Sequence, residues 1–327
     1  MADNEFTLKP TRMLTHPHTT RSRLMLEVAS ALVNRRDWPL LQARVSLREQ
    51  GSDEWPLTLF GSDSPATISE VAAGKVQFAM INPGMILKLA ALGSAPFRAP
   101  IPLRIIAVLP ALDQMVFAVK QSTGLRSIAD IRDRKFPLKL SLRGQPDHSL
   151  QVIIDHVCAA AGFTLDDIVS WGGEVRFDAG MPYGENRIGA VHRGEIDAIF
   201  DEGASAWGNM ALALGMTFLS LPEAMLQRLE AVGLRRGSIE RKNFPKLSAD
   251  VATLDFSGWP IYTLASTPDS LVRDFCRALE ESKALIPWAK AEPLPMAQMV
   301  CDSAEGHLEV PLHPAAANYW RELGYLS

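Results

Sequence analysis

The sequence has few cysteines, no strong charge of either sign and no long apolar run, and each shortage excludes a class of protein. Its 327 residues include three cysteines with no CxxC spacing, which argues against a disulfide framework. Cys158 and Cys276 fall on apolar faces of predicted helices, where we expect them to be buried. The formal net charge is −4 and the basic residues are scattered, so no nucleic-acid partner is expected. No run of about 18 apolar residues occurs, so no transmembrane helix is predicted.

The signatures of common enzyme and cofactor classes are also missing. The chain contains no GxGxxG, no P-loop and no GxSxG motif, so we predict no cofactor. His16 and His18 are close together, but no third ligand follows at a suitable spacing, so no metal site is predicted. What remains is an ordinary globular composition, with 47% hydrophobic and 21% charged residues. The length allows two domains of about 150 residues each.

One pattern occurs twice and organises the chain. Residues 60–83 contain a polar loop, a short helix, a glycine stop, a buried strand and a second polar loop. Residues 188–203 again contain a short helix, a glycine, a strand and polar residues at the end of the strand. In open α/β sheets, ligands bind outside the carboxyl ends of strands. One such unit in each half predicts two lobes that face each other across a cleft.

Strands and helices alternate along most of the remaining sequence, which indicates βαβ units and mainly parallel sheets. We therefore predict an α/β fold with two lobes and a ligand cleft between them. The first lobe is predicted to be discontinuous, with residues 1–120 and 252–327. The second lobe is predicted to contain residues 121–251.

Three stretches resemble a known family. They are Ile68–Pro83, the run Gly-Glu-Ile-Asp-Ala-Ile-Phe at 194–200, and the closing His-Pro-Ala-Ala-Ala-Asn-Tyr-Trp-Arg-Glu-Leu-Gly at 313–324. They are similar to the TAXI family of solute receptors, which serve TRAP transporters, and the order of elements resembles the type II periplasmic-binding-protein fold. The resemblance implies a solute-binding protein that captures a small carboxylate-bearing solute, an organic acid or an amino acid, as its lobes close. It also implies membrane permease subunits as possible partners.

The location and an enzymatic alternative stay open at this point. Residues 1–6 are acidic and polar and lack the features of a secretory signal. We therefore expect a periplasmic protein if an export signal has been removed, and otherwise a cytoplasmic one. The alternative is a cytoplasmic enzyme on the same fold, a decarboxylase or dehydratase acting on a cyclic or aromatic carboxylic acid, in which His16, His18 and His148 take part. A ligand-sensing module that acts on a partner protein is a third hypothesis.

The first group of candidate ligand-binding residues surrounds a predicted helix start. Thr19, Thr20 and Arg21 offer hydroxyls, free backbone N–H groups and a guanidinium, which together favour an anion. Arg21 can pair with a carboxylate through two hydrogen bonds. The alternative is that the hydroxyls only cap the helix and that Arg21 is solvated.

The other candidates lie at later loops and strand ends. Ser62 and Asn82 are neutral groups that can orient a ligand, although Ser62 also fits an ordinary turn. Glu202 can hold a ligand ammonium group or be a solvated carboxylate, and His148 can contact the ligand or cap a helix. The complete predicted set of ligand-binding residues is Thr19, Thr20, Arg21, Ser62, Asn82, Arg143, Gln145, His148, Asp178 and Glu202.

Overall fold

The structure is a computed structural model that describes residues 20–34, 42–48, 51, 53, 56–286, 288 and 292–327. The chain divides into two compact units, residues 1–42 and residues 43–327. In the first unit, helix α1 spans Thr20–Val33, where the apolar spacing predicts a helix. The second unit contains all the described strands, and it is considered by itself below.

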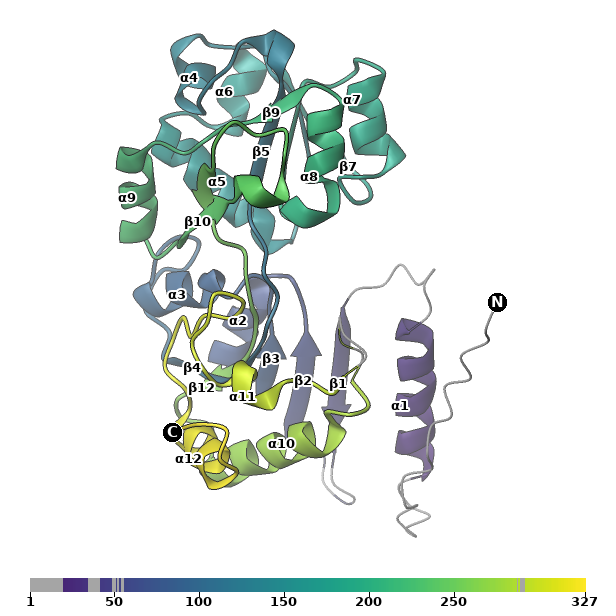
Figure 1. Cartoon of the computed structure of the whole chain (residues 1–327). Helices are drawn as coiled ribbons and strands as arrows, with labels where there is room; N and C mark the ends of the chain where they lie inside the picture. Colours follow the sequence, from purple (N-terminus) through teal and green to yellow (C-terminus); the bar gives the residue numbers. More distant parts are fainter. Residues whose placement is uncertain are drawn as a thin grey trace. The chain divides into compact units, whose positions relative to one another are not determined.

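Two five-stranded sheets form the second unit (Figure 1). The first sheet has the order β1-β2-β3-β12-β4, with β1 (Ala43–Leu47), β2 (Leu57–Gly61), β3 (Phe78–Met80), β4 (Leu103–Leu109) and β12 (Trp259–Leu264). The second sheet has the order β7-β6-β8-β5-β9, with β5 (Val116–Lys120), β6 (Lys139–Arg143), β7 (Glu174–Asp178), β8 (Ala198–Asp201) and β9 (Met216–Phe218). An antiparallel ribbon joins β10 (Arg236–Ile239) to β11 (Val251–Leu254). Each large sheet, with its helices, makes one lobe, so the predicted two-lobed α/β fold is confirmed.

The prediction of mainly parallel sheets is wrong, because both sheets are mixed. β2 pairs parallel with β3, and β6 pairs parallel with β7 and β8. β12 and β5 are antiparallel to the strands on both of their sides. β5 and β12 are the first strands after the chain crosses from one lobe to the other. Each therefore starts beside the last residue of a neighbouring strand and runs in the opposite direction: Val116 of β5 pairs with Asp201, and Trp259 of β12 pairs with Leu109. Apolar periodicity reports a strand but not its direction.

The passages between the sheets lie at residues 110–115 and 255–258. The residue limits of the two lobes stay a prediction, and the membership of β5 in the second sheet favours a first boundary before this strand. Among the described helices, none has the length and apolar character needed to cross a membrane.

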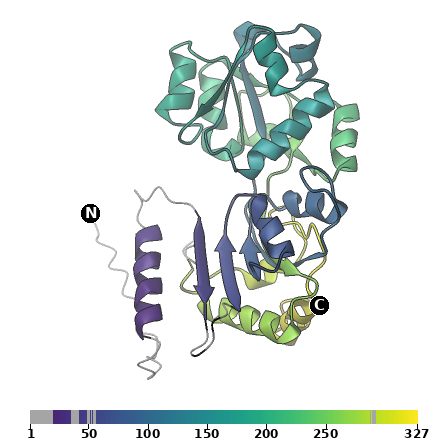
Figure 2. The same ribbon diagram turned by 180° about the vertical axis from the view of Figure 1, so that it is seen from behind.

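Helices cover both faces of the second sheet (Figures 1 and 2). The helices of the two lobes are α2 (Ala66–Ala72), α3 (Met85–Leu92), α4 (Ala129–Asp133), α5 (Ser149–Ala161), α6 (Leu165–Ser170), α7 (Ala190–His192), α8 (Ala204–Ala213), α9 (Glu223–Ala231), α10 (Asp269–Ser282), α11 (Met296–Met299) and α12 (Pro314–Glu322). Cys158 of α5 and Cys276 of α10 are buried and free, which confirms their predicted role as small core residues.

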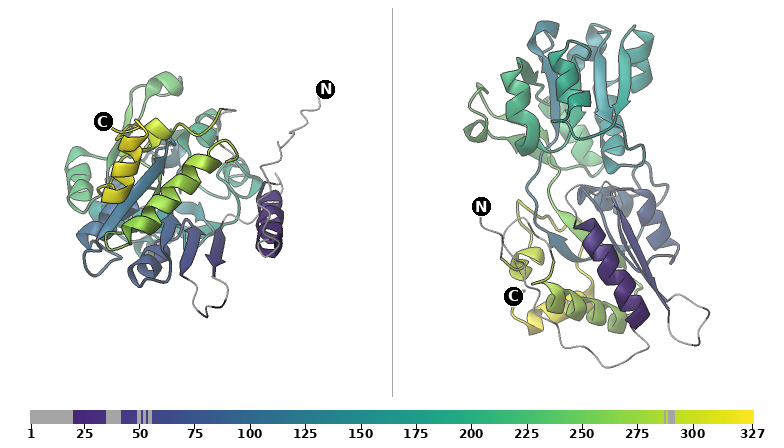
Figure 3. Two further views of the ribbon diagram at one scale, coloured as in Figure 1. Left: turned by 90° about the horizontal axis from the view of Figure 1, so that it is seen from below. Right: turned by 90° about the vertical axis from the view of Figure 1, so that its right-hand side faces the viewer.

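Helices α10 and α12 lie side by side against the first sheet (Figure 3). Trp320 of α12 is fully buried, and its Nε1 donates a hydrogen bond to the carbonyl of Ile106 in β4 at 2.9 Å. Arg273 of α10 and Glu322 of α12 join the exposed sides of the two helices through two hydrogen bonds. The closing helix thereby anchors the end of the chain to the first sheet.

The repeated pattern folds as predicted in both lobes. In the first lobe, α2 ends at Ala72, Gly74 follows two residues later, and β3 comes next. In the second lobe, α7 ends at His192, Gly194 follows two residues later, and β8 comes next. The two glycines have φ of 72° and 79°, in the left-handed region that other residues rarely adopt. The glycine at each helix end therefore turns the chain into a buried strand, and a polar loop follows the carboxyl end of that strand.

Candidate functional site

Polar side chains from both sheets meet where strands end. Arg143 is the last residue of β6, Glu202 directly follows β8, and Asn82 follows β3 in the other sheet. Nδ2 of Asn82 donates to Oε2 of Glu202 at 3.2 Å, which joins the two lobes. A second connection runs from the backbone N and the hydroxyl of Ser149 to the carbonyl of Asp63, at 2.8 and 2.7 Å.

Arg143 is the central cation of this cluster, and it is only 9% exposed. Its Nη2 lies 2.7 Å from Oδ1 of Asp201 and 2.7 Å from Oε1 of Glu202. Its Nε is buried and has no hydrogen-bond partner among the described residues. Leaving a buried donor unpaired costs about 1–3 kcal/mol, and more for a charged group. An oxygen acceptor that reached this nitrogen would therefore bind favourably.

A second arginine already balances Asp201. Arg187 is fully buried, and its Nη1 pairs with Oδ2 of Asp201. Its Nε donates to the Ser141 hydroxyl at 3.1 Å, and its Nη2 to the Ser141 carbonyl at 3.3 Å. Because Asp201 is shared between two guanidinium groups, Glu202 is the other carboxyl group that Arg143 contacts.

His148 caps helix α5, as the alternative interpretation of this residue predicts. Its Nδ1 accepts a hydrogen bond from the backbone N of Leu150 at 3.0 Å. Burial, reinforced by the charge of Arg143, lowers the His148 pKa from 6.5 to about 3, so the ring is neutral near pH 7. With Nδ1 as an acceptor, the ring proton is assigned to Nε2, which lies 3.0 Å from the donor Nη1 of Arg143. Two donors thus meet without an acceptor between them.

Glu202 is an acid whose ionisation the site opposes. Burial raises its pKa from 4.5 to about 8; Asp113 and Asp201 act in the same direction, while Arg143 opposes the rise. Asp113 accepts a hydrogen bond from the backbone N of Gly203 at 2.9 Å, and burial raises its pKa to about 6. Below about pH 8, Glu202 is therefore mainly protonated, and one of the two guanidinium charges is left without a carboxylate.

Three further candidates make contacts that fit local structural roles. Ser62 is buried, and its hydroxyl accepts from the backbone N of Ser64 at 3.0 Å, which is the turn interaction named as its alternative. Gln145 is half-buried, and its carbonyl accepts from the backbone N of His148 at 3.3 Å. Asp178 accepts from the Ser141 hydroxyl at 2.7 Å and pairs with Arg176. Their predicted contact with a ligand stays a prediction.

The candidates near the N-terminus belong to the first unit. Thr20 begins α1, and Arg21 is exposed on this helix. Thr19, and also His16 and His18 of the enzyme hypothesis, lie outside the described residues. Their predicted roles therefore stay predictions.

Several residues of the cluster were not predicted from the sequence. Arg187, Asp113, Asp63 and Ser141 carry no local pattern that distinguishes them from surface residues. Arg187 lies in a single π-helical turn, Glu185–Gly189, and only the fold shows that it is fully buried against Asp201. In the part of the chain that the structure describes, no group of three or more His, Cys, Asp or Glu side chains could hold a metal ion.

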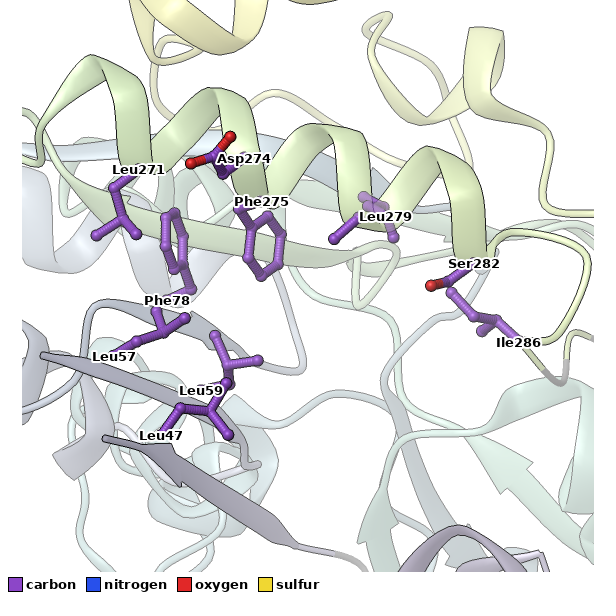
Figure 4. A pocket seen from close by; sticks show the side chains of 11 residues that line it. Leu47, Leu57, Leu59, Phe78, Leu271, Asp274, Phe275, Leu279, Ser282 and Ile286 are labelled. Atoms are coloured by element: carbon purple, nitrogen blue, oxygen red, sulfur yellow. The ribbon is translucent and has the colours of Figure 1, made fainter. Parts of the chain in front are cut away.

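A separate groove of about 370 Å³ lies between the first sheet and α10 (Figure 4). Leu57, Leu59 and Phe78 line it from the sheet, and Leu271 and Phe275 from the helix. Apolar side chains dominate this lining, so the groove offers little to orient a small polar solute. The charged cluster at the strand ends is the better candidate site.

The second unit thus has a two-lobed α/β fold in which polar residues from both lobes meet where strands end. Residues 62–324 match the NMT1-like family, and the chain belongs to this family of solute-binding proteins. The predicted class, a solute-binding protein, is thus confirmed, whereas membership of the TAXI family stays a prediction. A search of curated proteins found no match.

Comparison with solved structures gave distant similarities. One is the alkanesulfonate-binding protein SsuA from Xanthomonas axonopodis pv. citri bound to MOPS, with 14% identity over 68% of this chain and 60% of that chain (TM-score 0.33). Another is the periplasmic aliphatic sulphonate-binding protein SsuA from Escherichia coli, with 12% identity over 68% and 56% (TM-score 0.32). A third is the glycine betaine, L-proline-binding protein ProX from Borrelia burgdorferi, with 7% identity over 62% of both chains (TM-score 0.35). The chain spans less than two thirds of the length of each.

Proposed function

We propose that this protein binds a small solute through an oxyanion group, in the first place a carboxylate, at the cluster around Arg143. In this proposal the protein acts in the periplasm and delivers the solute to the permease of a TRAP-type transporter. The observation that carries the proposal is the buried guanidinium of Arg143, whose Nε has no partner among the described residues. The family supports a solute-binding role, and the resemblance of residues 68–83, 194–200 and 313–324 to TAXI receptors supports the transporter type.

The charges of the cluster favour an anion over a cation. Below about pH 8, Asp201 is the ionised carboxylate that contacts both Arg143 and Arg187, because the Glu202 carboxyl is largely protonated. Asp113 is ionised above about pH 6, but it accepts hydrogen bonds from backbone N–H groups instead. A singly charged solute would balance the remaining guanidinium. One oxygen can accept from Nε of Arg143, and an oxygen near Nη1 can also accept from Nε2 of His148.

Asn82 gives the site a contact from the other lobe. Its amide already reaches Glu202 across the two lobes, so a solute held by Arg143 lies within reach of both sheets. A neutral amide can orient a solute without a second charge that has to be desolvated. Binding at this position would therefore favour the arrangement in which the lobes meet.

The first experiment is a screen of organic acids and amino acids, each paired with its uncharged primary amide. We expect one or more acids to raise the melting temperature saturably, and the matched amide to have no effect. Calorimetric titration then compares wild type with Arg143→Met, which should bind about 10- to 100-fold more weakly because a charged hydrogen-bond donor is lost. Arg235→Met is the matched control, because Arg235 pairs with the buried Glu309 outside the cluster.

Two results would contradict the proposed site. One is an acid that binds Arg143→Met as tightly as wild type, which would place the anion elsewhere. The other is the failure of every acid and amino acid to saturate the protein, which would argue against anion binding altogether.

A further inference from the structure

Glu202 already contacts Arg143 and Asn82, the two residues at which the proposed function places the solute. One carboxyl oxygen lies 2.7 Å from Nη2 of Arg143, and the other accepts from Nδ2 of Asn82 at 3.2 Å. Its backbone is fixed as well, since its N donates to Asp201 at 2.8 Å and its carbonyl accepts from Nε1 of Trp207 at 2.7 Å. A carboxyl group held by a guanidinium on one side and an amide on the other has the contacts of a bound solute carboxylate.

We propose that Glu202 competes with the solute anion for Arg143, so that a proton is taken up by Glu202 when the anion binds above neutral pH. This inference rests on the proposed function. The solute anion takes over the guanidinium, and Glu202 then remains beside it as a neutral acid. The number of charges in the cluster is unchanged, because one carboxylate replaces another and one proton enters with it.

The surroundings of Glu202 determine which group titrates. The groups that face the cluster are Arg143 from β6, His148 from the start of α5, Asp201 from β8, Asp113 from the segment before β5, Asn82 after β3, and Asp63 beyond His148. Burial raises the pKa of Glu202 to about 8 and that of Asp113 to about 6, and it lowers that of His148 to about 3. Burial also raises the pKa of Asp63, while Arg143 opposes this rise. A titration near pH 8 is therefore assigned to Glu202.

Asn82 can hold Glu202 in both protonation states. Its Nδ2 donates to the carboxyl group, while its Oδ1 is buried without a partner among the described residues. The two ends of an amide are assigned from their hydrogen bonds, and rotation by half a turn exchanges them. After this exchange, Oδ1 can accept the proton of neutral Glu202. Glu202 can thus release Arg143 and keep its contact with the other lobe.

The test measures how anion affinity depends on pH in wild type and in Glu202→Gln. The probes are acetate and methanesulfonate, a carboxylate and a sulfonate that both stay ionised from about pH 6.5 to about pH 9.5. Wild-type dissociation constants should be flat below about pH 8 and then rise by up to about tenfold per pH unit. Glu202→Gln should show no such rise, and it should bind about tenfold more tightly than wild type near pH 9. The two probes distinguish a carboxylate site from one that also takes sulfonates.

Glu309→Gln is the matched control, because Glu309 is another buried acid paired with an arginine outside the cluster. It should keep the wild-type pH profile. If wild type and Glu202→Gln bind the anions with the same pH profile, the competition by Glu202 is refuted while the proposed anion site stands. If neither protein binds either anion at any pH, the proposed function fails and this inference fails with it.

Discussion

Arg143 and Arg187 contact the same carboxylate, but we expect their loss to have different consequences. Arg187 is fully buried and holds Asp201 together with both oxygens of Ser141. Breaking a buried ion pair by removal of one partner costs about 3–5 kcal/mol, because an uncompensated charge stays inside. Arg187→Met should therefore lower the free energy of unfolding by about this amount. Arg143→Met should cost less, about 1–3 kcal/mol, because Asp201 keeps Arg187 and Glu202 can become neutral.

The assay is equilibrium unfolding in urea near pH 7, with the two variants and wild type measured side by side. Equal slopes against urea concentration would show that the variants expose similar surface on unfolding. Solute affinity should rank the two variants in the opposite order. Arg143→Met should bind the anion about 10- to 100-fold more weakly than wild type, and Arg187→Met should retain the wild-type affinity under conditions in which the variant is folded. If Arg187→Met is within about 1 kcal/mol of Arg143→Met, the reasoning from the buried ion pair is refuted.

Three other variants test the charges around the site. His148→Asn should make the folding stability less sensitive to acid. The neutral His148 ring contributes stability that is complete above about pH 6.5 and lost as pH falls through about 3. Asn keeps an acceptor that can cap the helix, but it does not titrate. Urea midpoints at about pH 7 and about pH 4 check this, and an equal loss in both proteins would contradict it. For Glu202, the protonated form contributes stability that is complete below about pH 4.5 and lost as pH rises through about 8. Glu202→Gln should therefore gain in melting temperature over wild type between about pH 4.5 and about pH 8, and a constant difference over this range would speak against the raised pKa. Asn82→Asp should weaken acetate binding at least about tenfold, because a carboxylate would replace the amide that now lies 3.2 Å from Glu202, and unchanged calorimetric affinity would show that Asn82 lies away from the anion.

The sequence predicts local elements of this fold well and strand directions poorly. The glycine stops at Gly74 and Gly194, the buried strands after them and the closing helix from Pro314 follow from residue preferences and apolar spacing. The mixed direction of the sheets does not follow, because it depends on where β5 and β12 enter after the chain changes sheet. That information lies in the path of the chain rather than in any local pattern.

In the candidate site, too, the sequence predicts local positions well and contacts between distant residues poorly. Asn82, Arg143, His148 and Glu202 can be found because each follows or ends a predicted element. Their mutual contacts cannot be found in this way, since they join positions up to 120 residues apart in the sequence. Arg187 is the clearest case, because a single arginine in a short helical turn gives no sign that it will be fully buried beside Asp201.

The repeated unit explains why an amide and an acid meet at the lobe boundary. In each lobe, a helix, a glycine and a buried strand place polar residues just beyond the carboxyl end of the strand, so Asn82 after β3 and Glu202 after β8 hold comparable positions. A cation at the position of Asn82 would keep Glu202 ionised and bound beside Arg143, where it would oppose a second anion. An amide stabilises either protonation state, because it can donate to a carboxylate and accept from a carboxylic acid. The neutral residue in one lobe therefore leaves the acid in the other lobe free to change its charge, and that freedom is what the proposed exchange with a solute anion requires.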